Sequence, residues 1–204
     1  MKTGGHFSRR FFERSCLVVG PELLGAYLVR RLPDGTELAG RIVEVEAYLG
    51  DGSDPGSHTH RGETPRNRAM FGPPAHLYVY RSYGIHTCAN VVCEPAGRGA
   101  ALLLRALEPV AGAVGMRRAR GLRPGLPDRE IANGPGKLCQ AMRITLQDYG
   151  RSLVSGPLTL RRPAAADPAV SVERTRRIGL SKGREHPYRF LVTDSPFVSR
   201  ARPA

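Results

Sequence analysis

One arginine stands inside an otherwise apolar run and limits how this chain can fold. Residues 101–107 read Ala-Leu-Leu-Leu-Arg-Ala-Leu, a composition typical of a strand that is buried on both faces. A buried guanidinium is costly unless it is paired and hydrogen-bonded. The sequence therefore predicts one of two arrangements. Either a carboxylate on a neighbouring strand faces Arg105, or Arg105 lies at a sheet edge with its head group in water.

The candidate carboxylates lie on another predicted strand, residues 36–48. Strict alternation divides the second half of this strand into an apolar face, with Val43, Val45 and Ala47, and a face with two carboxylates, with Ile42, Glu44, Glu46 and Tyr48. We expect the apolar face to pack against the core. Alternation does not choose between Glu44 and Glu46 as the partner of Arg105.

The remaining pattern consists of short strands joined by tight turns, followed by helices. Hairpins are predicted for residues 26–32 with 36–48, and for residues 76–81 with 85–93. Helices are predicted for residues 109–120 and for residues 133–142, and further strands for residues 158–161 and 188–193. This order predicts an α+β fold: a single domain with a curved, mostly antiparallel sheet, surrounding helices and a protruding β-hairpin. We expect residues 1–10 to be a flexible N-terminus and residues 11–200 to form the domain.

The charge of the chain indicates a polyanionic partner. The formal net charge is +13, from 31 basic and 18 acidic residues, and nucleic acid is the usual polyanion. A GC-rich genome would explain why only Lys2, Lys137 and Lys182 are lysines, but not the excess of basic over acidic residues. Because no apolar run is long enough to span a membrane and the N-terminus lacks a signal-peptide pattern, we expect a soluble, cytoplasmic protein.

The cysteine pattern argues against a zinc site. Cys16, Cys88, Cys93 and Cys139 form no Cys-x-x-Cys pair and have no histidine at zinc-finger spacing, so we expect free, buried thiols. His58 and His60 are too isolated to suggest a metal site.

Several polar and aromatic residues are candidates for binding. Tyrosines in strands are usually core or surface filler, but Tyr83 beside the turn residue Gly84 is expected to project, as suits insertion into a base stack. Asn90 stands among apolar residues, where its amide needs a partner or a ligand. The segment from Gly134 to Lys137 begins a predicted helix and is either a phosphate site or a plain helix cap.

Together these segments resemble the 3-methyladenine DNA glycosylase family, of the alkyladenine glycosylase type. The matching segments follow one another in the family's order at residues 41–50, 64–68, 70–71, 77–80, 83–84, 88–90, 103–109 and 134–140. The resemblance covers the chain from about Phe11 to Ser199.

The resemblance implies a role for each matching residue. Glu46 would be the general base that activates a water, with Arg105 and the backbone carbonyl of Leu180 helping to hold that water. The base-binding residues would be Tyr48, His58 and Tyr80, which sandwich the flipped base, and Asn90, which excludes normal guanine by a clash with its exocyclic amine. Tyr83 would fill the gap that the base leaves in the duplex, and Arg66 and Lys137 would contact phosphates. The resemblance implies neither a metal nor a cofactor.

The function implied is that of a monofunctional DNA glycosylase of base excision repair. Its partner would be double-stranded DNA containing damaged purines, bound by a monomer; the implied substrates are 3-methyladenine, 7-methylguanine, hypoxanthine and ethenoadenine. Two alternatives stay open. A glycosylase with lyase activity would need an amine nucleophile, and neither Lys137 nor Lys182 lies in the pocket motifs. A non-catalytic nucleic-acid-binding protein would have no use for a buried arginine facing a carboxylate.

Overall fold

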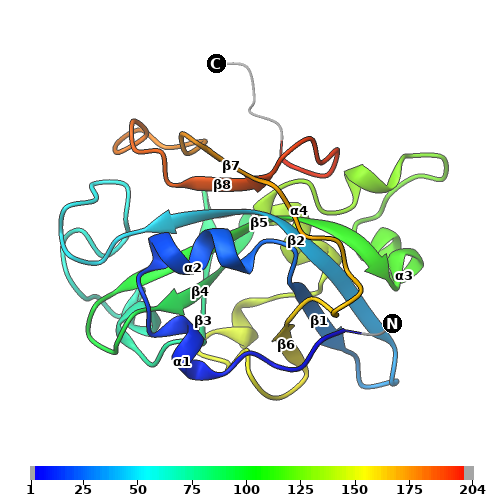
Figure 1. The fold of residues 1–204 in the computed structure, drawn as a ribbon, viewed down its shortest axis with the longest axis horizontal. Helices are drawn as coiled ribbons and strands as arrows, with labels where there is room; N and C mark the ends of the chain where they lie inside the picture. The colour runs from blue at the N-terminus through cyan, green and yellow to red at the C-terminus, as the bar shows by residue number, and fades with distance from the viewer. Residues whose placement is uncertain (1–2, 200–204) are drawn as a thin grey trace.

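A computed structural model describes residues 3–199, and Figure 1 shows their arrangement. One eight-stranded sheet forms the centre of the molecule, and every pair of neighbouring strands in it is antiparallel. The strands are β1 (Tyr27–Arg31), β2 (Glu37–Tyr48), β3 (Leu77–Ser82), β4 (His86–Cys93), β5 (Ala100–Ala111), β6 (Leu158–Arg161), β7 (Val172–Thr175) and β8 (Arg189–Val192). The prediction of an α+β domain with a curved antiparallel sheet is confirmed.

The helices are short and lie between or beside the strands. They are α1 (Arg9–Phe12), α2 (Cys16–Leu23), α3 (Ala113–Ala119) and α4 (Pro135–Ala141), with 3-10 turns at Arg68–Phe71, Asp128–Glu130 and Leu146–Asp148. In Figure 1, α2 lies across β2 and β5, and it contributes Val19 and Leu23 to the main core. Helix α4 packs on β4 and β5 and contributes Leu138 to the same core.

The strand β5 is longer than the sequence predicts. We expected a helix from residue 109, but β5 continues to Ala111, with Pro109 opposite Gly40 of β2. The helix α3 begins only after Gly112, whose φ of 71° is a left-handed conformation that glycine adopts without strain. The prediction was wrong because proline is compatible with the start of a helix and also with strand positions that donate no ladder hydrogen bond.

The sheet forks along β2. One edge of β2 pairs with β5, while the other edge pairs first with β1, up to Arg41, and then with β8, from Glu44 to Glu46. Strands β3 and β4 form the hairpin at the far side of β5. The fork brings β8 and the C-terminal segment beside the part of β2 that carries the two glutamates.

A β-bulge interrupts the alternation predicted for β2. Ile42 lies opposite Leu107 and Glu44 lies opposite Ala106, so Val43 is an extra residue with no partner on β5. Ile42 therefore joins Val45 and Ala47 in the main core, while Val43 lies outside it. The predicted faces of Ile42 and Val43 are wrong, because one extra residue reverses the alternation of all residues on one side of it.

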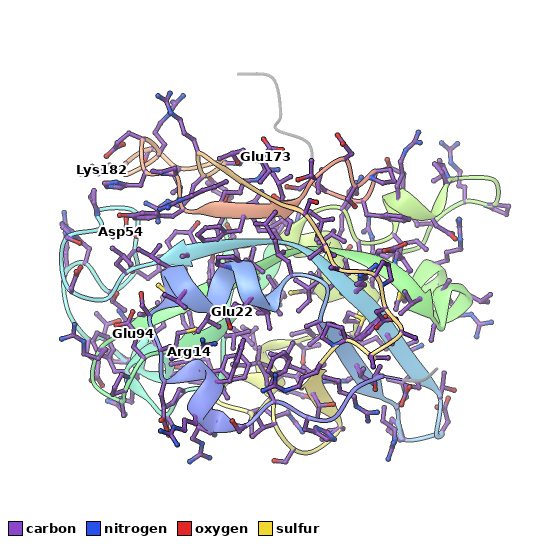
Figure 2. All side chains as sticks on the ribbon, viewed as in Figure 1. Arg14, Glu22, Asp54, Glu94, Glu173 and Lys182 are labelled. Carbon is purple, nitrogen blue, oxygen red and sulfur yellow. The ribbon has the colours of Figure 1, made fainter. Side chains whose placement is uncertain are left out.

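The packing of the domain includes residues that we expected in a flexible N-terminus. Gly4 donates a backbone hydrogen bond to Arg162, Arg162 donates one to Gly5, both at 2.9 Å, and Phe7 is buried in the core. In Figure 2, Arg14 of the following segment points toward Glu22 of α2, with which it forms an ion pair. Residues 1, 2 and 200, which we assigned to the ends of the predicted segments, lie outside the described residues.

The four cysteines are buried and unpaired, as predicted. Burial raises the pKa of the Cys16, Cys88, Cys93 and Cys139 thiols above the ordinary value. No helix within residues 3–199 is long and apolar enough to cross a membrane.

Candidate active site

Glu46, near the end of β2, has hydrogen bonds on both carboxylate oxygens. Its side chain is completely buried. Its Oε2 accepts from Nη1 of Arg105 at 3.0 Å and from the hydroxyl of Tyr48 at 2.9 Å, and its Oε1 accepts from the backbone N–H of Ile178 at 2.8 Å. Because all three partners donate, the carboxylate acts only as an acceptor.

Arg105 is buried and faces two carboxylates. Its side chain is 8% exposed, and it lies 2.8 Å from Glu44 and 3.0 Å from Glu46. Arg105 has no residue opposite it on β2, because Glu44 pairs with Ala106 and Val45 pairs with Leu104. This second irregularity, next to the bulge at Val43, brings the guanidinium to both glutamates. Alternation left the partner of Arg105 open between Glu44 and Glu46, and the structure shows that Arg105 binds both.

Glu44 is the more heavily paired of the two glutamates. Besides Arg105, its Oε1 accepts a hydrogen bond from Nε of Arg189 on β8 at 2.7 Å. Burial alone would raise the pKa of the Glu44 carboxyl, but the charges of Arg105 and Arg189 and the hydrogen bond from Ser199 hold this pKa below its ordinary value. Glu44 is therefore a buried counter-charge, not a solvated strand residue.

A pocket that is partly open to solvent lies beside Glu46. Five of the residues predicted from sequence line it: Tyr48, His58, Tyr80, Asn90 and Leu180. Gly56, Met70 and Tyr78 complete the lining. Tyr48 joins the pocket to the carboxylate, because its ring lines the pocket and its hydroxyl donates to Glu46.

The aromatic side of the pocket is a set of three packed rings. Tyr78 and Tyr80 alternate along β3 and stack at 5.3 Å, and the His58 ring meets the Tyr80 ring edge-on at 4.5 Å. Nδ1 of His58 shares a hydrogen bond of 2.9 Å with the Tyr78 hydroxyl. Burial, assisted by the charge of Arg66, lowers the pKa of His58, so the imidazole is neutral near pH 7. The result is an uncharged surface with flat rings, suited to a flat base.

Asn90 and Leu180 line the pocket from different elements, Asn90 from β4 and Leu180 from the loop after β7. The Asn90 amide donates to the backbone carbonyl of Tyr78 at 3.2 Å, which fixes its orientation on β4. Leu180 belongs to the loop after β7, two residues beyond the Ile178 amide that binds Glu46. Leu180 thus lines the pocket on the same loop that carries the amide bound to Glu46.

Tyr83 lies at the tip of the β3–β4 hairpin. Its side chain is 86% exposed, and both it and Gly84 have positive φ, 50° and 72°. The N–H of Ile85 donates to the carbonyl of Ser82 and closes the turn. A positive φ is uncommon for a bulky residue, but a tight hairpin turn of this type requires it at both central positions. The predicted exposure of the ring is confirmed, whereas its insertion into DNA stays a prediction.

The two predicted phosphate ligands differ in their surroundings. Arg66 is exposed, with its guanidinium carbon 5.8 Å from the centre of the Tyr80 ring, and it donates to the carbonyl of Arg81. Lys137 in the first turn of α4 donates to Glu130 at 3.0 Å and to Asn133 at 2.7 Å. A phosphate at Lys137 would compete with Glu130 for the ammonium group.

Several functional neighbours of the site were not predicted from the sequence. The Ile178 amide carries no residue-type signal, because every residue except proline has an N–H. Asp54 and Arg177, which form a buried ion pair behind Tyr48, lie 123 positions apart in glycine-rich segments that look solvated. Within residues 3–199, no group of three or more histidine, cysteine, aspartate or glutamate side chains is arranged to hold a metal ion.

Comparisons with known proteins agree on one family. Residues 10–196 match the family model described as methylpurine-DNA glycosylase. A protein of Rhodopseudomonas palustris is 47% identical over 200 residues, which cover 98% of this chain and 91% of the relative. A protein of Methanoculleus marisnigri is 49% identical over 193 residues, which cover 93% of this chain and 96% of the relative. Both relatives carry the provisional name 3-methyladenine DNA glycosylase.

Proposed function

This chain belongs to the methylpurine-DNA glycosylase family, and on that premise we propose that it removes damaged purines from double-stranded DNA as the first step of base excision repair. The single observation that carries the proposal is the position of Glu46. A buried carboxylate with three hydrogen-bond donors lies beside a pocket of flat rings. The excess of basic residues, 31 against 18 acidic ones, suits a polyanionic substrate.

In the proposed reaction a purine leaves the base stack and enters the pocket between Tyr48 and the pair His58 and Tyr80. A water held by Glu46, Arg105 and the Leu180 carbonyl attacks C1′ of the flipped nucleotide. The C1′–N9 bond breaks, its electron pair leaves with the purine, and one water proton passes to Glu46. A cationic methylated purine leaves as a neutral base, whereas a neutral purine leaves as an anion that takes up a proton from solvent. The products are a free base and an abasic site with a new C1′ hydroxyl. General-base help of this kind is typically worth about 10²–10⁴ in rate.

The proposed substrates are purines with a weakened glycosidic bond or an altered edge. 3-Methyladenine and 7-methylguanine are cationic in DNA and leave readily, whereas hypoxanthine and ethenoadenine are neutral and need more help from the site. Asn90 is proposed to disfavour guanine, whose exocyclic amine would meet the amide that Tyr78 holds in place. 7-Methylguanine carries the same amine, but its cationic ring makes it a far better leaving group than normal guanine.

The attacking group is proposed to be water, without a covalent intermediate. A lyase would need an amine in the pocket. Among the described lysines, Lys137 is paired with Glu130, and Lys182 is exposed at the outer edge of the molecule in Figure 2; neither lines the pocket. Treatment with borohydride during a reaction on damaged duplex should therefore trap no protein–DNA adduct.

Single-turnover assays on duplexes that each contain one defined lesion test the proposal. Glu46→Gln keeps the shape of the side chain but removes the proton acceptor, so hypoxanthine excision should fall by about 10²–10⁴ with lesion binding retained. The matched control is Glu37→Gln at the start of β2, which lies in a partly exposed ion pair with Arg31. Duplex binding without release of any base would instead identify a non-catalytic DNA-binding protein.

A further inference from the structure

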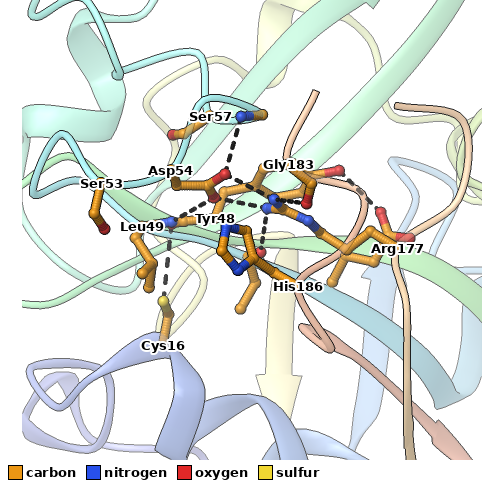
Figure 3. A network of polar contacts seen from close by, with 12 residues as sticks. Cys16, Tyr48, Leu49, Ser53, Asp54, Ser57, Arg177, Gly183 and His186 are labelled. Atoms are coloured by element: carbon orange, nitrogen blue, oxygen red, sulfur yellow. Dashed lines mark hydrogen bonds and ion pairs between the residues drawn. The ribbon is translucent and has the colours of Figure 1, made fainter. Parts of the chain in front are cut away.

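One arginine behind the pocket contacts three separate parts of the site. Nη1 of Arg177 donates to Asp54 at 2.6 Å and to the carbonyl of Ala47 at 3.0 Å, and its Nη2 donates to Asp54 and to the carbonyl of Gly183, both at 2.7 Å. Figure 3 shows these bonds converging on the guanidinium. The guanidinium carbon also lies 4.7 Å from the centre of the Tyr48 ring. Arg177 thus joins β2 to the loop after β2 and to the loop after β7.

The loop after β2 is held through Asp54. The Asp54 side chain, which is completely buried, accepts backbone hydrogen bonds from Leu49 at 3.1 Å and from Gly56 at 2.9 Å. Gly56 and His58 of this loop line the pocket. The ion pair with Arg177 therefore fixes the part of the chain that carries one wall of the pocket.

Arg177 is the second residue of the loop after β7, which ends at Thr175. The next residue, Ile178, donates its N–H to Glu46, and Leu180 lines the pocket. The bond from Arg177 to Gly183 closes this loop on its far side. A shift of the guanidinium would consequently move both the amide that binds Glu46 and the loop that brings Leu180 to the pocket.

The two loops are too close together to tolerate side chains where they meet. A Cβ on Gly56 would lie 2.9 Å from the carbonyl oxygen of Lys182 and 3.0 Å from Nη2 of Arg177. A Cβ on Gly183 would lie 2.8 Å from the same Nη2, at a φ of 65°. Both glycines are therefore required by the packing around the guanidinium.

The ion pair of Arg177 with Asp54 is better suited to fixing the positions of the two loops than to stabilising the fold. The side chains of Arg177 and Asp54 are both completely buried, and replacing such a pair by apolar groups is often neutral or stabilising. In addition, the buried Nε of Arg177 has no hydrogen-bond partner among the described residues.

We propose that Arg177 is a positioning residue for the reaction proposed above: it holds the two loops against β2, so that the Ile178 amide stays on Glu46 and the Tyr48 ring stays in the pocket wall. The inference rests on the proposed function. It assigns to Arg177 and Asp54 a contribution to the excision step, with no contact to the base.

The test uses the variant Arg177→Lys. Lysine keeps the positive charge, but its ammonium group cannot make the four hydrogen bonds by which the planar guanidinium reaches three chain segments. Single-turnover excision of hypoxanthine should fall by roughly 10- to 100-fold, as small misplacements of reacting groups do. Affinity for the lesion duplex should be unchanged, because phosphate contacts elsewhere supply most of it. The matched control is Arg176→Lys, the same change at the exposed neighbouring position, which should excise at the wild-type rate.

A second comparison separates positioning from a general effect on folding. On a 7-methylguanine duplex, where departure of the base is easier, Arg177→Lys should cost much less in a Glu46→Gln background than in the wild type, because the positioned group is already gone. Equal losses in both backgrounds would overturn the proposal.

If Arg177→Lys does not fold, Asp54→Asn decides, since it keeps the side-chain shape but removes the charge that fixes the guanidinium. Asp54→Asn should also slow excision of hypoxanthine, and its affinity for the lesion duplex should be unchanged. Wild-type excision by the variant that folds would overturn the inference and leave the proposed function intact. Absence of excision by the unsubstituted protein on every lesion would overturn both.

Discussion

Ser199 donates its hydroxyl to Oε1 of Glu44 at 2.7 Å, which ties the C-terminal end of the described chain to the charge network beneath the pocket. The backbone N–H of Ser199 donates to the other oxygen of Glu44. Glu44 thus receives hydrogen bonds from Ser199, Arg105 and Arg189, while Glu46 receives a different bond from Arg105. Glu44 therefore balances the charges of Arg105 and Arg189, whereas Glu46 lies beside the pocket.

This charge balance predicts that Glu44→Gln destabilises the protein. The change would leave Arg105 and Arg189 with one buried carboxylate fewer, and breaking a buried ion pair from one side typically costs about 3–5 kcal/mol. Urea unfolding measures the loss. Glu37→Gln, in a partly exposed pair, should cost less than about 1 kcal/mol. Equal midpoints for both variants would show that Glu44 is not the counter-charge described.

Stability should also depend on acid pH. The pKa of Glu44 lies below the ordinary value of 4.5 for a glutamate and that of Asp54 below the ordinary value of 3.8 for an aspartate, in each case because arginine charges and hydrogen bonds outweigh burial. A lowered folded-state pKa contributes stability that is present above the unfolded value and is lost as the pH falls through the folded value. The free energy of unfolding should therefore fall progressively below about pH 4.5.

The acid dependence has its own control in Glu44→Gln, which cannot titrate at position 44. Urea unfolding at a series of pH values should give a shallower decline for this variant than for the wild type. Parallel curves would mean that Glu44 has the same proton affinity in the folded and unfolded chains.

Tyr83→Ser should weaken base flipping without altering the chemistry of the site. A flipped base leaves a gap whose unstacking costs a few kcal/mol, and a ring from the hairpin tip would offset part of that cost. Ethenoadenine fluorescence reports departure from the stack. We expect a smaller or shorter-lived signal and slower excision from paired duplex, with relief opposite a mismatch or gap.

The control for the hairpin tip is Tyr83→Phe, which keeps the ring and loses only the hydroxyl. It should flip and excise as the wild type does. If Tyr83→Ser matches it on paired duplex, the exposed ring is surface filler.

Binding to undamaged duplex should weaken steeply with salt, because arginine–phosphate contacts release condensed counterions. Arg66→Gln should lower the slope of log affinity against log salt by about one unit. Lys137→Ala should lower it by up to about one unit, with the smaller value if Glu130 keeps the ammonium. Unchanged slopes for both variants would remove these residues from the phosphate interface, and Lys137 would be a plain helix-cap residue.

The sequence predicted those parts of the fold that depend on local signals. The Pro33–Gly35 turn and the Ser82–Gly84 turn located both hairpins, and the charged residue within residues 101–107 correctly required a carboxylate partner. These signals depend on neighbouring residues or on the high energy of an unpaired buried charge. Each could be detected in one stretch of chain.

The parts that escaped prediction depend on register and on distant contacts. Alternation gave the wrong face for Ile42, because the bulge at Val43 has no signature in the side-chain pattern. Nothing in the spacing links Asp54 to Arg177, or Ser199 to Glu44, because contacts between remote loops are decided by the packing of the whole sheet. The irregular register between β2 and β5, which the alternation pattern did not predict, also brings Arg105 to both glutamates.

The buried cysteines have a consequence for survival under chemical stress. Methylating electrophiles attack thiolates, which are stronger nucleophiles than the nitrogen atoms of purines, and reaction requires an accessible, deprotonated sulfur. All four thiols are buried and have a raised pKa. The four cysteines therefore present no accessible thiolate to the reagents that would produce the proposed substrates, and exposure to them should leave these thiols unmodified.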